Sequence, residues 1–334
     1  MECHPAPPHA RSWPPAAVIA ACLACAPASI PARGAGSGAH AVDGACSADP
    51  ERFVVVEDGD APLVISSTHA GTAMPLGCDA GSELLRPLAQ RSCAQVSDDA
   101  CASGPCRASG DDRNARLITF ALVEDLARCL GARPALALTE VSRSLVDMNR
   151  DAHDPGGLQC AMGDRATLPY WEAYHRAIEG LVAHAVEVGG ARALLIDLHT
   201  YNSLTAAPPP AIMLGTGSPI GHTLPHLVAE DPTLPLLFGD AGLRAHLLGA
   251  FAAVDGVKVE PASLTAPIDG LFRGRYVVHR YARVMAGDTA TVGPAVDSLQ
   301  IEISSVLRDD AEAAAQGVAD AVCAAFGERL RGGP

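Results

Sequence analysis

The sequence predicts an α/β layer fold with a largely parallel central sheet. From about residue 52, short β-branched apolar runs alternate with longer stretches whose apolar residues recur at helical spacing. This alternation is typical of a sheet layered with helices. The apolar run Ala193–Leu198, closed by a polar cluster, indicates a buried central strand. Ser298–Ser304 alternates strictly between apolar and polar residues, which is typical of a strand with two different faces.

The first half of this body is predicted from apolar spacing and from the residues that end helices. Arg113–Leu130 repeats apolar residues at helical spacing, follows two aspartates that can cap it, and precedes a glycine that stops it. Leu168–Val188 predicts a long helix that ends at two glycines. The strands expected here are Phe53–Val56, Leu63–Ser66, Ala135–Leu138 and Ser144–Met148.

The second half continues the alternation of strands and helices. Ala211–Leu214 is an apolar run between prolines and glycines, which predicts a strand, and Val257–Val259 predicts a short one. Helices are expected over Asp240–Ala253 and Asp309–Leu330. Because no internal repeat and no long Pro/Gly linker divides residues 50–330, we expect one domain there. Ligands of such sheets bind on the loops beyond the carboxyl ends of the strands.

Composition argues against several classes of protein. The chain has 334 residues, of which 49% are hydrophobic and 19% are charged, so it is not a disordered chain. No stretch of about 18 apolar residues is present, which argues against a protein with several membrane spans. The net charge is -14, with 24 basic and 38 acidic residues, and this argues against nucleic-acid binding. The oligomeric state stays open.

Residues 1–45 are predicted to be a signal peptide or lipoprotein leader followed by a flexible linker. Arg11 precedes the apolar run Ala16–Ala26, and small residues follow, in the order of a secretory signal. The stretch Ile19–Cys22 resembles a bacterial lipoprotein box, which makes Cys22 a candidate lipid anchor. We therefore expect an exported protein, whether periplasmic, lipid-anchored or extracellular. The alternative is a disordered Pro/Ala-rich tail on a cytoplasmic protein.

The cysteines favour the same location. Three of the 11 lie in the leader, and the even number that remains fits disulfides formed in an oxidising compartment. We expect residues 78–108 to be an inserted loop held by its own disulfides, and the alternative is a set of free, buried cysteines. No C-x-x-C pair among the remaining cysteines points to a zinc ribbon. These cysteines are Cys46, Cys78, Cys93, Cys101, Cys106, Cys129, Cys160 and Cys323.

Polar clusters stand where two of the predicted strands end. His69 follows the second strand, and Asp197 and His199 close the most apolar one, two residues apart and so on one face. Asp111 and Asp112 stand at a helix start. Two histidines and a carboxylate are a frequent ligand set of catalytic zinc, with one position open for water. The structural alternatives are a loop histidine without a ligand, a satisfied Asp–His pair and a helix cap, and which aspartate completes the set stays open.

Two further segments can supply chemistry beside such a metal. Glu302 lies in the polar stripe of the strand Ser298–Ser304, where a carboxylate can act as general base toward water. Arg143 and Arg150 flank a short strand candidate, and arginines bind carboxylates through two parallel hydrogen bonds. The alternatives are a solvated strand face for the first segment and structural Asp–Arg pairs for the second.

The order of these motifs resembles that of the N-formylglutamate amidohydrolase family. The resemblance covers about residues 62–305, most of the predicted domain. The matching motifs, in chain order, are Ser66-x-x-His69-x-Gly71, Asp112, Ser142-Arg143, Asp147-x-Asn149-Arg150, Tyr174-His175, Asp197-x-His199, Gly270 to Tyr276, and Gln300-x-Glu302. The resemblance implies a three-layer α/β fold similar to that of zinc carboxypeptidases, with a central, mostly parallel mixed sheet flanked by helices.

The resemblance also implies an activity and a role for each residue. The implied activity is metal-dependent hydrolysis of the amide bond of an N-acyl, N-formyl-like amino acid or small peptide. His69, Asp112 and His199 are the implied ligands of one zinc ion. Glu302 is the implied base that takes a proton from water, and Arg143 is the implied catalytic arginine at the carbonyl. The implied substrate contacts are Asn149, Arg150, His175, Tyr276 and Arg280.

This chain departs from the family pattern at several positions. Thr68 stands where the family has proline before the histidine, Ala115 stands where it has threonine, and Arg273 and Arg275 intrude beside the implied pocket. The two arginines favour an acidic substrate, and the Cys-rich insertion can act as a lid. Two other classes stay open: an exported, non-catalytic binding protein on this fold, and a metal-free hydrolase, for which no Gly-x-Ser-x-Gly motif is present.

Overall fold

The computed structural model describes most of the chain from residue 49 onward. The described residues are 49–73, 112–143, 145–152, 167–190, 192–202, 211–217, 223–231, 233–263, 266, 274, 276–284 and 295–331. All of them belong to one compact unit, residues 44–334. The predicted leader over 1–45 and the predicted insertion over 78–108 lie outside the described residues, as do six of the eight cysteines that follow the leader. Those expectations therefore stay predictions.

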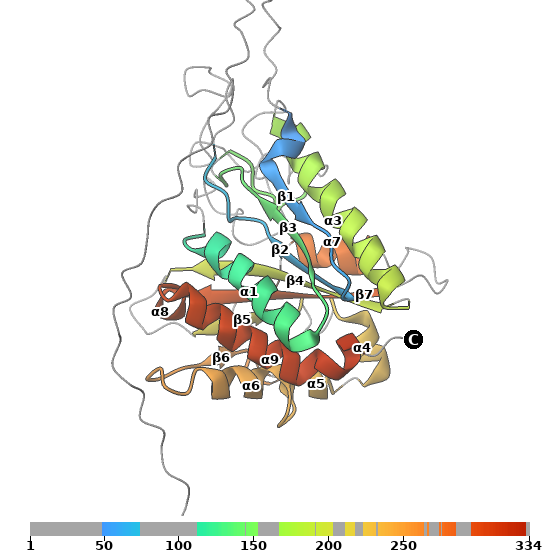
Figure 1. The fold of residues 1–334 in the computed structure, drawn as a ribbon. Helices are drawn as coiled ribbons and strands as arrows, with labels where there is room; N and C mark the ends of the chain where they lie inside the picture. The colour runs from blue at the N-terminus through green and yellow to red at the C-terminus, as the bar shows by residue number, and fades with distance from the viewer. Residues whose placement is uncertain are drawn as a thin grey trace, which may run out of the picture. The chain divides into compact units, whose positions relative to one another are not determined.

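A mixed sheet runs through the centre of the fold, and its seven described strands lie in the order β1-β3-β2-β4-β7-β5-β6 (Figure 1). The strands are β1 Val54–Glu57, β2 Leu63–Ser67, β3 Ala135–Thr139, β4 Arg192–Tyr201, β5 Ile212–Gly215, β6 Val259–Glu260 and β7 Ala295–Ser304. β2, β3, β4 and β7 run parallel, and β6 is parallel to β5. β1 and β5 are antiparallel to their neighbours β3 and β7. The predicted α/β class with a mixed, mostly parallel sheet is confirmed.

Helices cover both faces of this sheet, which gives three layers (Figure 1). The helices are the 3-10 turn η1 Pro50–Phe53, α1 Ala115–Leu130, α3 Leu168–Val188, α4 Pro225–Glu230, α5 Pro235–Phe238, α6 Leu243–Ala250, α7 Tyr276–Val284, α8 Ser305–Arg308 and α9 Ala311–Arg331. α1, α6 and α9 pack on one face, and α3 and α7 pack on the other. Among the helices of the described part, none combines the length and apolarity needed to cross a membrane.

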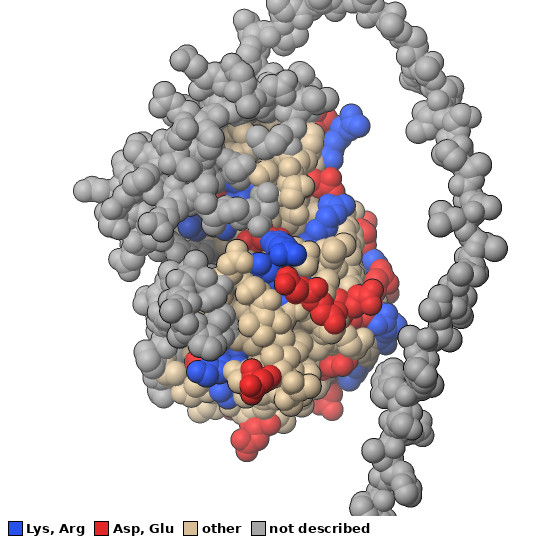
Figure 2. Space-filling view, turned by 90° about the vertical axis from the view of Figure 1, so that its left-hand side faces the viewer, with Lys and Arg blue, Asp and Glu red and all other residues tan. Residues whose placement is uncertain are grey.

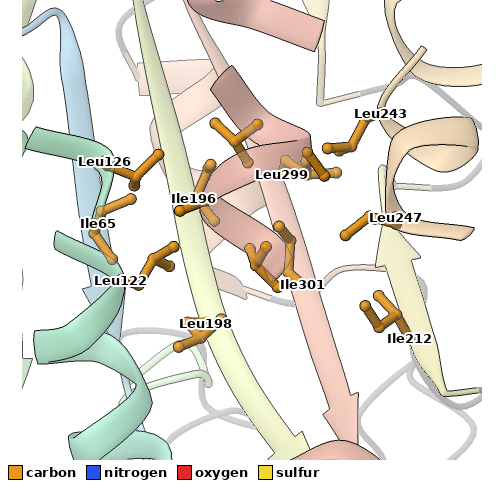
Figure 3. Packing of buried hydrophobic residues seen from close by; sticks show 14 of the residues in the cluster. Ile65, Leu122, Leu126, Ile196, Leu198, Ile212, Leu243, Leu247, Leu299 and Ile301 are labelled. Carbon is orange, nitrogen blue, oxygen red and sulfur yellow. The ribbon is translucent and has the colours of Figure 1, made fainter. Parts of the chain in front are cut away.

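The apolar core lies on both sides of the central strands. In β4, Ile196 and Leu198 belong to the cluster that α1 and α9 cover, whereas Ala193 and Leu195 belong to the cluster under α3. Figure 3 shows Ile196 and Leu198 beside Leu122 of α1. Because β4 is buried on both faces, its residues are apolar at successive positions rather than at every second one. This explains why the run predicted a central strand.

Replacing Leu122 by alanine should lower the free energy of unfolding by about 2–5 kcal/mol. Leu122 is fully buried between α1 and the sheet, so its truncation removes apolar contact and leaves a cavity. Leu117→Ala on the same helix is the matched control, because Leu117 is 59% exposed and its loss should cost little. Urea denaturation measures both variants, and equal losses in the two would contradict this assignment of the core.

The predicted strand Ser144–Met148 is wrong over the residues that the structure describes. The backbone N–H groups of Leu145 and Val146 donate to the carbonyl of Ser142 at 2.9 and 3.2 Å, so the chain turns here. Leu145, Val146 and Met148 are nevertheless buried. This short apolar run therefore has the sequence pattern of a buried strand although its backbone forms a turn. Periodicity alone does not distinguish the two.

Several other elements differ from their predicted lengths or were not predicted. The helix expected over Asp240–Ala253 contracts to α6, and the helix expected over Asp309–Leu330 starts at Ala311, after the separate α8. Ser304 ends β7 and accepts a hydrogen bond from the backbone N–H of Val306 at 3.4 Å, which starts α8 at the end of the strand. The helices α4, α5 and α7 were not expected.

A disulfide joins Cys129 of α1 to Cys323 of α9, two helices of one layer. Their α-carbons are 6.4 Å apart, within the range that a disulfide spans. For this pair, the expectation of disulfides is confirmed and the alternative of free thiols is wrong.

Charged side chains on the described surface are mixed in sign. On the face shown in Figure 2, acidic and basic side chains lie close together, with uncharged surface between the groups. Arg133 pairs with Glu57 and Glu124 at 2.6 and 2.7 Å, and Arg176 pairs with Glu51 at 2.9 Å. Exposed pairs of this kind contribute little to stability.

Candidate metal centre

Three side chains with metal-binding atoms meet at the carboxyl ends of β2 and β4. His69 follows β2 by two residues, His199 lies near the end of β4, and Asp112 precedes α1 by three residues. One ligand atom from each lies within 4.8 Å of the others. β2 and β4 are parallel neighbours, so their ends bring distant segments of the chain to one place. The three residues expected to share a metal thus lie together.

His69 is oriented by a carboxylate and presents one unpartnered nitrogen. Its Nε2–H donates to Asp147 Oδ1 at 2.8 Å, and the side chains of both residues are buried. Because Nε2 carries the proton, Nδ1 carries a lone pair. This Nδ1 is buried without a hydrogen-bond partner among the described residues, 3.6 Å from Asp112 Oδ2. The structure therefore aims a buried acceptor at the third member of the group.

His199 is held in the same way by a second carboxylate. Its Nε2 lies 2.8 Å from Asp197 Oδ2, and its Nδ1 lies 3.0 Å from Asp112 Oδ2. Burial would lower the pKa of His199, but the carboxylates of Asp197 and Glu302 and the hydrogen bond with Asp112 raise it well above 6.5. A proton or a metal ion must lie between Nδ1 and the carboxylate, because two acceptors repel each other at that distance.

Asp112 does not cap helix α1, so the structural alternative of a helix cap is wrong for this residue. The N-cap of α1 is Asn114, and Asp112 Oδ2 instead accepts the backbone N–H of Thr200 at 3.1 Å. Burial would raise the pKa of Asp112, but His69 and His199 lower it well below 3.8. The carboxyl is therefore ionised beside the two imidazoles.

Arg143 holds the carboxylates from one side. Its Nε donates to Asp147 Oδ2 at 3.1 Å, and a terminal nitrogen of its guanidinium lies 3.9 Å from Asp112 Oδ1. Burial would raise the pKa of Asp147, but Arg143, His69 and Arg150 keep it well below 3.8. The Asp–Arg pairing that was an alternative for this segment is present, and it lies inside the site.

Glu302 lies opposite His199 in the register of β7 against β4. Its stripe of the strand, with Ser298, Gln300 and Ser304, is at most 5% exposed, so the alternative of a solvated strand face is wrong. Gln300 donates an amide N–H to Glu302 Oε1 at 2.5 Å. Burial raises the pKa of Glu302 from 4.5 to about 7. A carboxyl in this state can accept and release a proton near neutral pH.

The residues present fit a zinc ion. Two imidazole nitrogens and a carboxylate oxygen are usual protein ligands of catalytic zinc, and they leave the fourth position for water. Each histidine keeps its other ring nitrogen on a carboxylate, as metal-ligating histidines commonly do. One cation between these side chains would give the unpartnered Nδ1 of His69 a partner. The same cation would lie between Nδ1 of His199 and Oδ2 of Asp112, which would otherwise face each other as two acceptors.

The other predicted site residues fall into two groups. Asn149 is buried beside the centre, with its side-chain nitrogen 3.4 Å from His199 Nε2, and Arg150 follows it. The second group lies where α3 and α7 meet: α3 carries His175, and α7 carries Tyr276 and Arg280. Both ring nitrogens of His175 have protein partners, Tyr281 Oη at 2.8 Å and the Met148 carbonyl at 3.0 Å. The guanidinium of Arg280 donates to Tyr276 Oη and Glu179 Oε1, both at 2.5 Å.

Sequence reasoning missed Asp147 as the partner of His69. The signal available was its place in the Arg143–Arg150 motif, but the contact joins residues from different strands and loops, which spacing does not show. Of the three aspartates considered as the acidic ligand, Asp112 lies in the group, Asp197 lies behind His199, and Asp111 lies outside the described residues.

Fold and site together define a class of protein. It is a three-layer α/β chain with a buried His–Asp–His group, suited to a metal ion, at the carboxyl edge of a mostly parallel sheet. A glutamate lies beside this group on the adjacent central strand.

Comparison with known proteins gives structural likeness only. No family model and no curated protein matches this chain. A gene product of Agrobacterium tumefaciens has a similar structure, with 15% identity and a TM-score of 0.49 over 83% of this chain and 94% of that one. An N-formylglutamate amidohydrolase from Ralstonia eutropha is similar at 16% identity and a TM-score of 0.47, over 83% of this chain and 98% of that one. Likeness at this level does not identify an activity, so the function has to be inferred from this chain's own residues.

Proposed function

We propose that this chain is a zinc-dependent amidohydrolase that cleaves the amide bond of an N-acyl, N-formyl-like amino acid or small peptide. The observation that carries the proposal is the pair of buried histidines, His69 and His199. Each keeps one ring nitrogen on a carboxylate and turns the other toward Asp112. The buried Glu302 beside His199 favours an enzyme, because a binding protein needs no general base.

Each residue of the centre has a task in such a hydrolysis. A zinc ion held by His69, Asp112 and His199 would supply Lewis-acid activation of water and of the amide carbonyl. We assign the removal of a proton from the attacking water to Glu302, and its register opposite His199 supports this role. The same carboxyl can then give that proton to the leaving nitrogen, so that amide and water become acid and amine.

Arg143 and Arg150 supply positive charge at the edge of the centre. The side chain of Arg143 is 15% exposed and is fixed by its ion pair with Asp147. A guanidinium has five N–H donors, so Arg143 can hold this carboxylate and also donate to a carbonyl oxygen that gains negative charge. Arg150, partly buried nearby, favours a substrate that carries a free carboxylate.

Removal of the metal should abolish hydrolysis, and added zinc should restore it. Amine release would be measured with N-formyl and N-acetyl derivatives of glutamate, aspartate and leucine, before chelation, after it and after zinc is returned. We expect faster turnover of the acidic derivatives, because the sequence adds Arg273 and Arg275, which lie outside the described residues and whose charge would attract a second carboxylate. A chain that binds zinc yet hydrolyses none of these amides would contradict the proposal and favour a binding protein. Equal rates for acidic and neutral substrates would contradict the proposed substrate class alone.

A further inference from the structure

We propose that Trp171 and His175 of α3 are positioning residues that set the zinc affinity of the centre. They do not touch the candidate ligands. They hold the backbone on either side of Asn149, and through it the carboxylate that orients His69 and the amide that lies beside His199. The inference rests on the proposed metal centre and adds residues that the mechanism does not use.

Two side chains of α3, Trp171 and His175, each form a hydrogen bond with a backbone carbonyl. The indole N–H of Trp171 donates to the carbonyl of Arg150 at 3.0 Å, and His175 Nε2 lies 3.0 Å from the carbonyl of Met148. A carbonyl only accepts, so Nε2 of His175 carries the proton. The hydroxyl of Tyr281 lies 2.8 Å from Nδ1 of His175 and donates to the backbone carbonyl of the same residue at 3.0 Å. These two contacts define a clamp, made of Trp171 and His175, around Asn149.

The clamped stretch connects to both candidate metal-binding histidines. The backbone N–H of Asn149 donates to Asp147 Oδ1 at 3.0 Å, the same oxygen that accepts His69 Nε2–H at 2.8 Å. The side-chain nitrogen of Asn149 lies 3.4 Å from His199 Nε2, and its oxygen accepts the backbone N–H of Val277 at 3.0 Å. A shift of this stretch would therefore move the carboxylate that orients His69 and the amide that lies beside His199.

The stretch needs such support because it is not part of the sheet. Residues 145–152 form turns and bends instead of a strand ladder, apart from a single bridge residue, so few neighbouring backbones fix their carbonyls. A buried carbonyl without a partner is costly, so the clamp also satisfies groups that the fold requires to be bonded.

The clamp itself is rigidly packed. Trp171 and His175 are four residues apart on one helix face, each 1% exposed, with ring centroids 4.0 Å apart. Tyr276 of α7 lies against both, at centroid distances of 5.8 and 5.5 Å. The pair is thus seated between two helices and can hold the turn in one position.

The test is the dissociation constant for zinc, measured by competition with a chromophoric chelator. His175→Phe keeps a ring but loses both hydrogen bonds, and we expect it to weaken zinc binding about tenfold or more, the usual effect of removing support behind a ligand. His175→Gln offers a donor and an acceptor again and should recover most of the affinity. Trp171→Phe removes one donor only and serves if His175→Phe does not fold.

A matched control separates positioning from stability. Ile178→Ala, one turn along α3, truncates a fully buried side chain of the same apolar cluster. It should lower the thermal midpoint and leave the zinc affinity within about twofold of wild type. If His175→Phe and Trp171→Phe bind zinc as tightly as wild type, or if Ile178→Ala weakens binding as much as they do, the clamp is overturned. A wild-type chain that binds no zinc would instead overturn the proposed metal centre.

Discussion

His199→Ala should leave the chain without tightly bound zinc, whereas the wild type should carry about one ion per chain. The variant loses one of three protein donors, and Asp197 and Asp112 lose the imidazole that both contact at 2.8 and 3.0 Å. Three protein ligands are the usual minimum for catalytic zinc, so two should not retain it through dialysis. His69→Ala should give the same loss. Elemental analysis of the purified, dialysed proteins measures the result.

The matched control for this pair is His184→Ala. His184 is an exposed histidine of α3 whose Nε2 contacts the carbonyl of Gly59. Its removal should leave both the zinc content and the rate of amide hydrolysis unchanged. One zinc per chain in His69→Ala and His199→Ala alike would show that the ion sits elsewhere, and the candidate centre would be wrong.

Glu302→Gln should lower kcat for amide hydrolysis by about 10²–10⁴-fold while the zinc content stays at the wild-type level. Glutamine has nearly the shape of the carboxyl and can stay in the place that Gln300 helps to fix. It cannot accept a proton, so the attacking water loses its base. Steady-state kinetics with an N-formyl amino acid, together with elemental analysis, separate this chemical defect from a loss of metal.

Glu312→Gln is the control for the change of one glutamate to its amide. Glu312 lies exposed in the first turn of α9, and its replacement should leave kcat and zinc unaltered. If Glu302→Gln kept kcat within about threefold of wild type, another group would have to take the proton. The role proposed for Glu302 would then be wrong.

Much of the fold could be predicted because its strongest signals are local. The apolar run that becomes β4 and the spacing that becomes α1 and α3 depend on burial of one or two faces, which each segment encodes in its own residues. The turn over Leu145–Met148 could not be predicted in this way. Its apolar residues are buried as those of a strand would be, but its backbone N–H groups bond to the carbonyl of Ser142. The spacing of apolar residues does not distinguish such a turn from a strand.

The candidate centre could be predicted by residue type but not in its arrangement. His69, Asp112 and His199 were expected together because they follow strands or precede a helix at one edge of the sheet. Asp197 was expected beside His199 because the two residues lie two apart on one strand, whereas the contact of Asp147 with His69 joins segments 78 residues apart, which sequence spacing does not show. The burial of the stripe that carries Glu302 depends on what covers β7, which its own alternation does not specify.

The most direct test of the metal centre is an anomalous difference map from crystals of the wild-type chain, recorded at the zinc absorption edge. We expect one strong peak bonded to Nδ1 of His69, Nδ1 of His199 and a carboxylate oxygen of Asp112, at about 2.0–2.2 Å from each. A map from zinc-soaked crystals with no peak at these three atoms would contradict the centre, and with it the proposed hydrolysis.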